Sequence, residues 1–205
     1  MMGKTHIAVG IAASYLIIQP KTVPEIITAT VGGCIGGVMA DIDVKIDNSN
    51  RFARKASMDA VYGELLALAL SATLLAADYF YGGQIIQTII NHWQRSAAGA
   101  VLFIILCILG KKSDHRDRTH SLLALILCTA SVFLIDTSIG IAFGIGYASH
   151  LLIDIFNKSP IRLFYPLKKG ICTKICYADR LGNELFLIFG VCITAFYLFF
   201  ITKVG

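Results

Sequence analysis

The chain has 205 residues, of which 56% are hydrophobic and only 15% charged, and its mean hydropathy is +0.71. Because soluble domains carry about a quarter charged residues, this composition excludes an ordinary soluble protein and predicts an integral membrane protein. The formal net charge of +5 does not indicate a nucleic-acid partner, since in a membrane protein the distribution of Lys and Arg matters more than their sum. We expect membrane lipid, and no nucleic acid, as the partner.

Seven apolar runs, bounded by charges or by Pro and Gly, predict an all-α membrane bundle of six to seven helices in a single domain over residues 1–205. The expected helices cover residues 6–19, 24–40, 59–81, 96–110, 120–135, 138–157 and 183–202. The first and the fourth fall short of the roughly 20 residues that comfortably cross a bilayer, so we expect these two to be the doubtful spans. Glycines at near-helical spacing in the second and sixth runs predict close packing of these two helices with their neighbours.

The distribution of basic residues predicts the orientation of the chain. If all seven runs cross, the N-terminus and segments 41–58, 111–119 and 158–182 share one face. Of the 18 Lys and Arg residues, only Lys21, Arg95 and Lys203 fall on the other face, which leaves fifteen on the first. Because cytoplasmic loops are enriched in Lys and Arg, the first face is predicted to be cytoplasmic, with the C-terminus outside.

The polar residues that could carry chemistry lie at helix ends on this same face. They are His6, Asp41, Asp43, His115, His120, His150, Asp154 and Glu184. The predicted topology alone brings them to one side of the membrane, and four of the five histidines are among them. This convergence predicts a metal site facing the cytoplasm.

Within this set, His150 and Asp154 stand four apart and therefore share one face of a helix that is otherwise apolar. An imidazole and a carboxylate at this spacing can bind one cation, although a hydrogen bond between them that pins two helices would explain them equally well. Asp41 and Asp43 close the second helix, where the helix dipole disfavours anions. A cation would relieve this, but a solvated helix end is the simpler alternative.

The segment from His115 to Ser121 is a polar island between two apolar runs. Its two histidines, His115 and His120, are candidate ligands because neutral imidazole is the commonest side-chain ligand of transition metals. Arg116 and Arg118 beside them could hold an anionic phosphate oxygen, but a cytoplasmic loop rich in basic residues is expected from topology without any chemistry.

The ordered set of motifs resembles a known family, the YdjM-like bacterial inner-membrane proteins described as membrane-bound metal-dependent hydrolases. The likeness runs through Thr5-His6, Asp41-Ile42-Asp43, His115-Arg116, Thr119-His120-Ser121, Gly146-Tyr147, Ser149-His150, Asp154, Tyr165-Pro166-Leu167 and Gly182-Asn183-Glu184. Two positions depart from the family pattern: Ala40 stands where Pro is usual, and Asp117 where Gly is usual. The family is also distantly similar to zinc-dependent phospholipase C and to single-strand-specific zinc nucleases, and phosphodiester chemistry carried over from them is an analogy at the level of fold.

The resemblance and the residue pattern together predict a membrane-bound hydrolase that binds one or two divalent ions, with zinc as the first choice. The expected ligands are His6, Asp41, Asp43, His115, His120, His150 and Asp154, more than one tetrahedral ion needs. The metal would activate water, Arg116 or Arg118 would stabilise negative charge, Asp43 would accept the proton, and Glu184 would complete the site. A lipid or a lipid-linked phosphoester is the expected substrate. The alternative is a non-enzymatic metal or proton transporter, or a scaffold, that uses the same residues.

Overall fold

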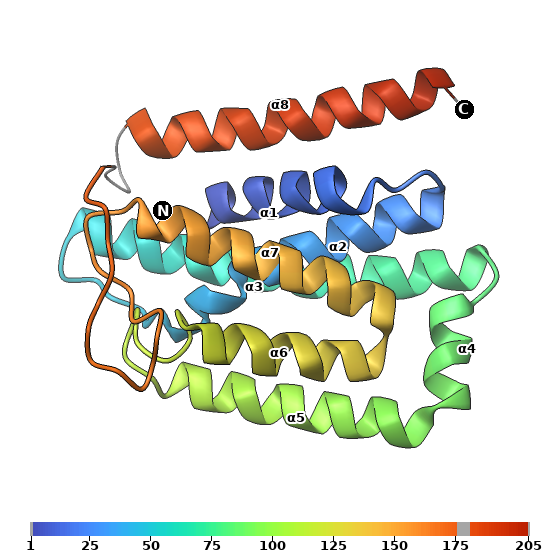
Figure 1. Cartoon of the computed structure of the whole chain (residues 1–205), viewed down its shortest axis with the longest axis horizontal. Helices are drawn as coiled ribbons and strands as arrows, with labels where there is room; N and C mark the ends of the chain where they lie inside the picture. The colour runs from blue at the N-terminus through green and yellow to red at the C-terminus, as the bar shows by residue number, and fades with distance from the viewer. Residues whose placement is uncertain (1, 176–180, 205) are drawn as a thin grey trace.

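The computed structural model describes residues 2–175 and 181–204, and these residues form a bundle of helices (Figure 1). The long helices are α1 (Gly3–Ile18), α2 (Val23–Met39), α3 (Arg51–Phe80), α5 (Trp93–Lys111), α6 (Leu122–Ile135), α7 (Thr137–Ile155) and α8 (Leu181–Val204). A short helix α4 (Gln84–Asn91) and a 3-10 helix η1 (Ala40–Asp43) complete the set. Apart from an isolated bridge between Ile161 and Ile171, the described part of the chain contains no β-structure. The all-α prediction is confirmed.

Five of these helices are long and apolar enough to cross a membrane: Val23–Asp43, Ala53–Phe80, Trp93–Lys111, Thr137–Ile155 and Leu181–Ile201. The chain is therefore a multi-pass membrane protein, with α1 and α6 as its shorter apolar helices. The first helix is short, as predicted. The fourth predicted helix was also expected to be a doubtful span, and this prediction was wrong. Helix α5 begins at Trp93 and gains length from polar residues that an apolar run does not include, whereas α6, predicted as 120–135, is the short one.

Two further boundaries differ from the prediction for local reasons. Helix α3 begins at Arg51 instead of residue 59, because the Asn50 side chain accepts a hydrogen bond from the amide of Ala53 and caps a polar first turn. Helix α4 was not predicted at all. The Asp78 side chain accepts hydrogen bonds from the amides of Ile85 and Ile86, both at 2.9 Å, and so holds the start of α4 against the end of α3.

Helices α1, α2 and α7 form the centre of the bundle and approach one another through glycine, as the spacing predicted. A Cβ atom at Gly36 would lie 2.1 Å from the carbonyl oxygen of Phe143 in α7, and one at Gly10 would lie 2.4 Å from the carbonyl oxygen of Gly33. Small residues permit such backbone contact between helices in lipid. This close approach brings the first residues of α1 next to the last turn of α7.

The long helices run back and forth, so that their connections gather at two ends of the bundle (Figure 1). The start of α1, the segment after η1, the α5–α6 connection and the segment after α7 share one end. The α1–α2 connection, α4 and the end of α8 lie at the other. This is the alternation expected from the sequence, and the end that holds η1 is the one where the predicted site residues lie.

Candidate metal centre

The structure brings all seven predicted ligands together in three overlapping groups. Each group offers nitrogen and oxygen atoms within 4.8 Å of one another: His6 with His150 and Asp154, Asp41 with His120 and His150, and Asp43 with His115 and His120. His150 and His120 each belong to two groups, so the three groups form one continuous cluster. Its members come from α1, η1, the α5–α6 connection and α7.

The central group is a nearly equilateral triangle of donor atoms. The Nε2 atoms of His120 and His150 are 3.3 Å apart, and the Asp41 Oδ1 atom lies 3.6 Å from the first and 3.7 Å from the second. Such a triangle places its centre about 2 Å from each corner, which is the bond length of zinc to imidazole nitrogen and carboxylate oxygen. The three side chains therefore fit a shared cation in both donor type and spacing.

The ring of His150 is held so that Nε2 faces this triangle. Its Nδ1 atom lies 2.6 Å from the carbonyl oxygen of Gly37 and donates its proton there. Histidines that bind metals usually donate the other ring N–H to a carbonyl or carboxylate, which fixes the tautomer and the ring orientation. The close approach of α2 and α7 thus leaves the Nε2 lone pair of His150 free to bind a metal.

His6 extends the cluster toward α1. Its ring stacks on that of His150 at 3.5 Å between centroids, and its Nε2 atom lies 3.4 Å from Asp154 Oδ1. Both nitrogens of His6 are buried and neither makes a hydrogen bond. Buried polar atoms are normally satisfied, and a cation between His6 and Asp154 would satisfy the nitrogen that faces the carboxylate.

Asp43 differs from the other carboxylates because hydrogen bonds already engage both of its oxygens. Its Oδ1 atom lies 2.7 Å from His115 Nδ1, and its Oδ2 atom accepts bonds from the Arg116 amide at 3.0 Å and from the Thr119 hydroxyl. Oδ2 also lies 3.5 Å from His120 Nδ1. These contacts are typical of a carboxylate that orients the histidines and the connection that carries them.

The carboxylates of the cluster alter the pKa of His120, which lies outside the membrane-spanning segments. Burial would lower the pKa of His120, but the carboxylates of Asp41 and Asp43 outweigh burial and raise this pKa to about 9. Without a metal, the protonated ring therefore compensates the carboxylates. A bound cation would replace that proton, because metal ligands must be deprotonated.

Of the remaining predicted residues, Arg116 lies at the cluster and two others do not. The Arg116 Nη2 atom lies 3.5 Å from Asp154 Oδ2, and its side chain is 16% exposed, so it borders both the cluster and the solvent. Arg118 lies over the ring of Tyr165, 5.9 Å from its centroid. Glu184 pairs with Lys4 at 3.1 Å, and its side chain is half exposed.

The sequence analysis missed two residues that hold the cluster in place. The buried Asn183 side chain accepts hydrogen bonds at 2.9 Å from the amide of Met2 and from the hydroxyl of Thr5, the neighbour of His6. The Tyr147 hydroxyl donates to the carbonyl oxygen of Thr119 at 2.6 Å. Both residues belong to the motifs Gly182-Asn183-Glu184 and Gly146-Tyr147, but an uncharged side chain there does not by itself indicate a structural role.

Comparison with known proteins shows the family of the chain. The chain is 25% identical over 143 residues to a protein of Bacillus subtilis (strain 168) described as "Uncharacterized protein YvsG", an alignment that covers 63% of the chain and 88% of that protein. No solved structure matches the chain. The family model described as "YdjM inner membrane protein" matches residues 1–204, and the chain therefore belongs to the YdjM inner membrane protein family.

Proposed function

We propose that this protein is a membrane-bound hydrolase that uses one or two divalent ions, with zinc as the first choice, to cleave a phosphoester or lipid-linked substrate. The observation that carries the proposal is the triangle of Asp41, His120 and His150, whose 3.3 to 3.7 Å edges match ligands on a shared ion. The unsatisfied nitrogens of His6 support a second position beside Asp154. Imidazole and carboxylate together suit zinc and similar transition metals.

A divalent metal, when bound, supplies Lewis acidity and activates water near neutral pH. The chain's own residues then position charge and protons around it. Arg116 reaches from the rim toward Asp154, where its guanidinium can hold an anionic oxygen of the substrate. Asp43, the residue predicted to accept the proton, acts in this proposal through His115, because the His115 ring is 42% exposed and its Nδ1 bonds to the carboxylate.

In this proposal the site faces the cytoplasm, and the basic residues at the same end of the bundle support this orientation. A substrate there would approach from the cytoplasm or from the inner leaflet. Arg118 and Glu184 have no role in the proposal, because their contacts are to Tyr165 and Lys4.

The transporter alternative gains nothing from the acidic residues elsewhere in the chain. A transporter is expected to carry ionisable groups along a path between the two faces. However, Asp78 caps α4 and Asp136 caps α7 through the amide of Ile139. Glu64 pairs with Lys111 at 3.1 Å. These contacts account for all three acids, and the hydrolase proposal is preferred.

The test is metal analysis and hydrolysis by the full chain purified in detergent. We expect wild-type protein to retain zinc and to hydrolyse bis(4-nitrophenyl) phosphate or a phospholipid, and His150→Ala to lose both by at least about tenfold. His92→Ala is the matched control, because His92 is exposed and lies between α4 and α5, which meet at the end of the bundle opposite the cluster. Wild-type protein with no more metal than His150→Ala would contradict the proposal. Bound metal without hydrolysis of either substrate would instead favour the non-enzymatic alternative.

A further inference from the structure

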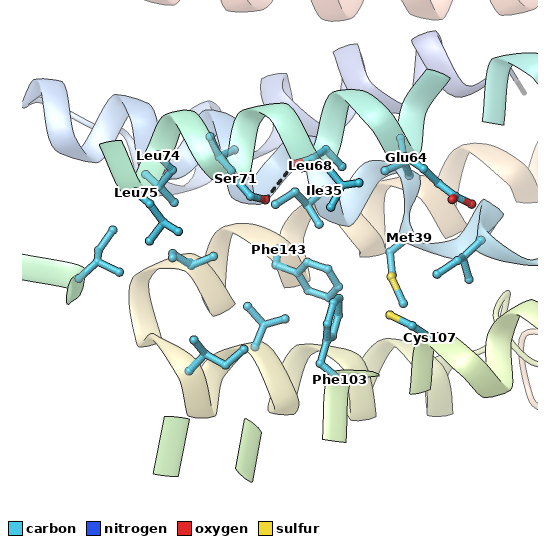
Figure 2. Close-up of a pocket in the computed structure, with 18 of the residues that line it drawn as sticks. Ile35, Met39, Glu64, Leu68, Ser71, Leu74, Leu75, Phe103, Cys107 and Phe143 are labelled. Carbon is cyan, nitrogen blue, oxygen red and sulfur yellow. Dashed lines mark hydrogen bonds between the residues drawn. The ribbon is translucent and has the colours of Figure 1, made fainter. Parts of the chain in front are cut away.

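A cavity of about 500 Å³ lies between α2, α3, α4, α5, α6 and α7, beside the candidate metal centre. Its size is within the range of small-molecule sites, about 300–1,000 Å³. Figure 2 shows α3 and α5 on opposite sides, with the apolar side chains of Leu68, Leu74, Phe103 and Phe143 between them. This lining suits a hydrocarbon ligand.

The polar groups of the lining lie where an amphiphile would need them. Glu64 and Lys111 form a salt bridge at 3.1 Å, with side chains 36% and 58% exposed. Lys111 is the last residue of α5 and therefore belongs to the end of the bundle that carries the cluster. In contrast, the Ser71 hydroxyl bonds to the carbonyl oxygen of Ala67 within its own helix, as the dashed line in Figure 2 marks, and so offers little to a ligand. The cavity is apolar along its length and charged at one end.

This charged end adjoins the cluster through η1. Ile42 lines the cavity, while its neighbours Asp41 and Asp43 belong to the cluster. Helix α5 approaches η1 closely because residue 110 is glycine: a Cβ atom there would lie 2.8 Å from Ile42 Cγ2. The cavity-lining residue Ile42 is thus the direct sequence neighbour of two candidate ligands.

The cavity opens on the side that faces lipid. Leu68 and Leu75 line it, yet they are 68% and 46% exposed. Both belong to α3, which, like α5 opposite, is long and apolar enough to cross the membrane. In the hydrocarbon layer an opening of this kind meets acyl chains, because water is absent there.

We propose that this cavity binds one hydrocarbon chain of an anionic membrane amphiphile, with its headgroup at Lys111, next to the candidate metal centre. Lys111 supplies the positive charge that an anionic headgroup requires. On binding, the headgroup would replace Glu64 as the ion-pair partner of Lys111. The identification of this amphiphile as the substrate rests on the proposed function. The binding of its hydrocarbon chain in the cavity does not.

The experiment uses the full chain in phosphatidylcholine vesicles that contain a small fraction of phosphatidic acid with a photoreactive diazirine on one acyl chain. Crosslinked positions are mapped by mass spectrometry. We expect labels on the cavity side of α3 and on α5 near Phe103 and Cys107, in addition to lipid-facing surfaces. Ala67→Phe should fill the cavity and lower its labelling several-fold. Ala69→Phe is the matched control, because Ala69 is exposed on the same helix and does not line the cavity.

A second measurement tests the end of the cavity at Lys111, where the headgroup is proposed to bind. Lys111→Gln should reduce the preference of the cavity for the phosphatidic acid probe over the same diazirine probe with a phosphatidylcholine headgroup, while labelling of outer surfaces stays constant. Thermal unfolding in detergent shows that each variant is folded. Cavity labelling that Ala67→Phe does not change, or labels confined to outward faces, would each overturn the proposal.

His150→Ala separates this inference from the proposed function. This variant should lose metal and hydrolysis yet keep the cavity label. Hydrolysis by wild type without cavity labelling would overturn only the proposal that the cavity binds a hydrocarbon chain. Cavity labelling in a wild-type protein that holds no metal would overturn the proposed function but would still support binding of a hydrocarbon chain in the cavity.

Discussion

His120 and His150 face each other through their Nε2 atoms, 3.3 Å apart, although thirty residues separate them in the chain. The opposite nitrogen of each ring is directed at the protein: His150 Nδ1 bonds to the Gly37 carbonyl, and His120 Nδ1 lies 3.5 Å from Asp43. The rings are therefore oriented before any metal binds. This arrangement assigns different roles to the two carboxylates of η1.

The first prediction compares these two carboxylates. Asp41 contributes a corner of the donor triangle, so Asp41→Asn should remove most of the bound metal. Asp43 orients histidines through hydrogen bonds, and loss of such an orienting contact costs about 10–100-fold in metal affinity. Asp43→Asn should therefore bind metal more weakly but measurably. Titration of the apo-protein with zinc against a competing chelator gives both affinities.

An equal and complete loss of metal in Asp41→Asn and Asp43→Asn would contradict this division of roles. It would instead return Asp43 to the set of direct ligands, as the sequence analysis had it. Asp47→Asn controls for the loss of one negative charge near η1, because Asp47 is exposed and bonds only to Ser49 among the contacts described.

The second prediction concerns the attachment of α1 to α8. Asn183 is buried and its side chain accepts hydrogen bonds from Met2 and Thr5, so Asn183→Ala leaves the Met2 amide without this acceptor and the Thr5 hydroxyl with only the longer contact to the carbonyl oxygen of residue 183. Loss of the partner of a buried donor costs about 1–3 kcal/mol. We expect a lower unfolding temperature in detergent and, because His6 follows Thr5, a weaker second metal equivalent.

The neighbouring residue provides the control for this prediction. Glu184→Gln removes only an exposed pair with Lys4, and exposed ion pairs contribute about 0–1 kcal/mol. A larger loss of stability in Glu184→Gln than in Asn183→Ala would show that Glu184 is the structural residue of this motif.

The sequence was sufficient to predict which residues cluster, but not how they face one another. Helix ends on one side of a membrane converge whatever the details of packing, so His6, His120 and Asp154 could be grouped from topology alone. The orientation of each ring depends on contacts such as His150 with Gly37, which hydropathy does not encode. The different contacts of Asp41 and Asp43 likewise depend on the 3-10 helix η1, which follows α2 and was not predicted.

Other features escaped prediction because they depend on short or polar segments. Helix α4 has eight residues, and its start is held by hydrogen bonds from the amides of Ile85 and Ile86 to Asp78, a residue of the preceding helix. The cavity beside the cluster arises where α3 and α5 stand apart, and this spacing depends on the shapes of several helices together. The glycine contacts were predictable because they require only small residues at helical spacing.

The third prediction tests the packing of α2 on α7. In Gly36→Ala the new Cβ atom would lie 2.1 Å from the backbone oxygen of Phe143, so the helices must separate. Overpacking of this kind costs about 1–3 kcal/mol. We expect a lower unfolding temperature and reduced metal retention, because α2 and α7 carry the Gly37 and His150 contact.

Gly63→Ala is the matched control on a neighbouring helix. There the nearest atom to the new Cβ is a Val38 methyl group at 3.1 Å, and alanine also favours the helix more than glycine does, by about 1 kcal/mol. Its unfolding temperature should stay near that of wild type. If Gly36→Ala were as stable as Gly63→Ala, the backbone contact between α2 and α7 would be looser than described.

The fourth prediction concerns the orientation of the protein in the membrane. This orientation is inferred from the distribution of positive charges and can be tested at the two ends of the bundle. Asn48 lies in the segment after η1, at the end that carries the cluster, and Asn91 ends α4 at the opposite end. Both are exposed. Asn91→Cys should react with a membrane-impermeant maleimide in intact spheroplasts, whereas Asn48→Cys should react only after permeabilisation, with labelling of the parent chain subtracted as background. The reverse pattern would place the metal centre outside and would show that the charge rule fails for this chain.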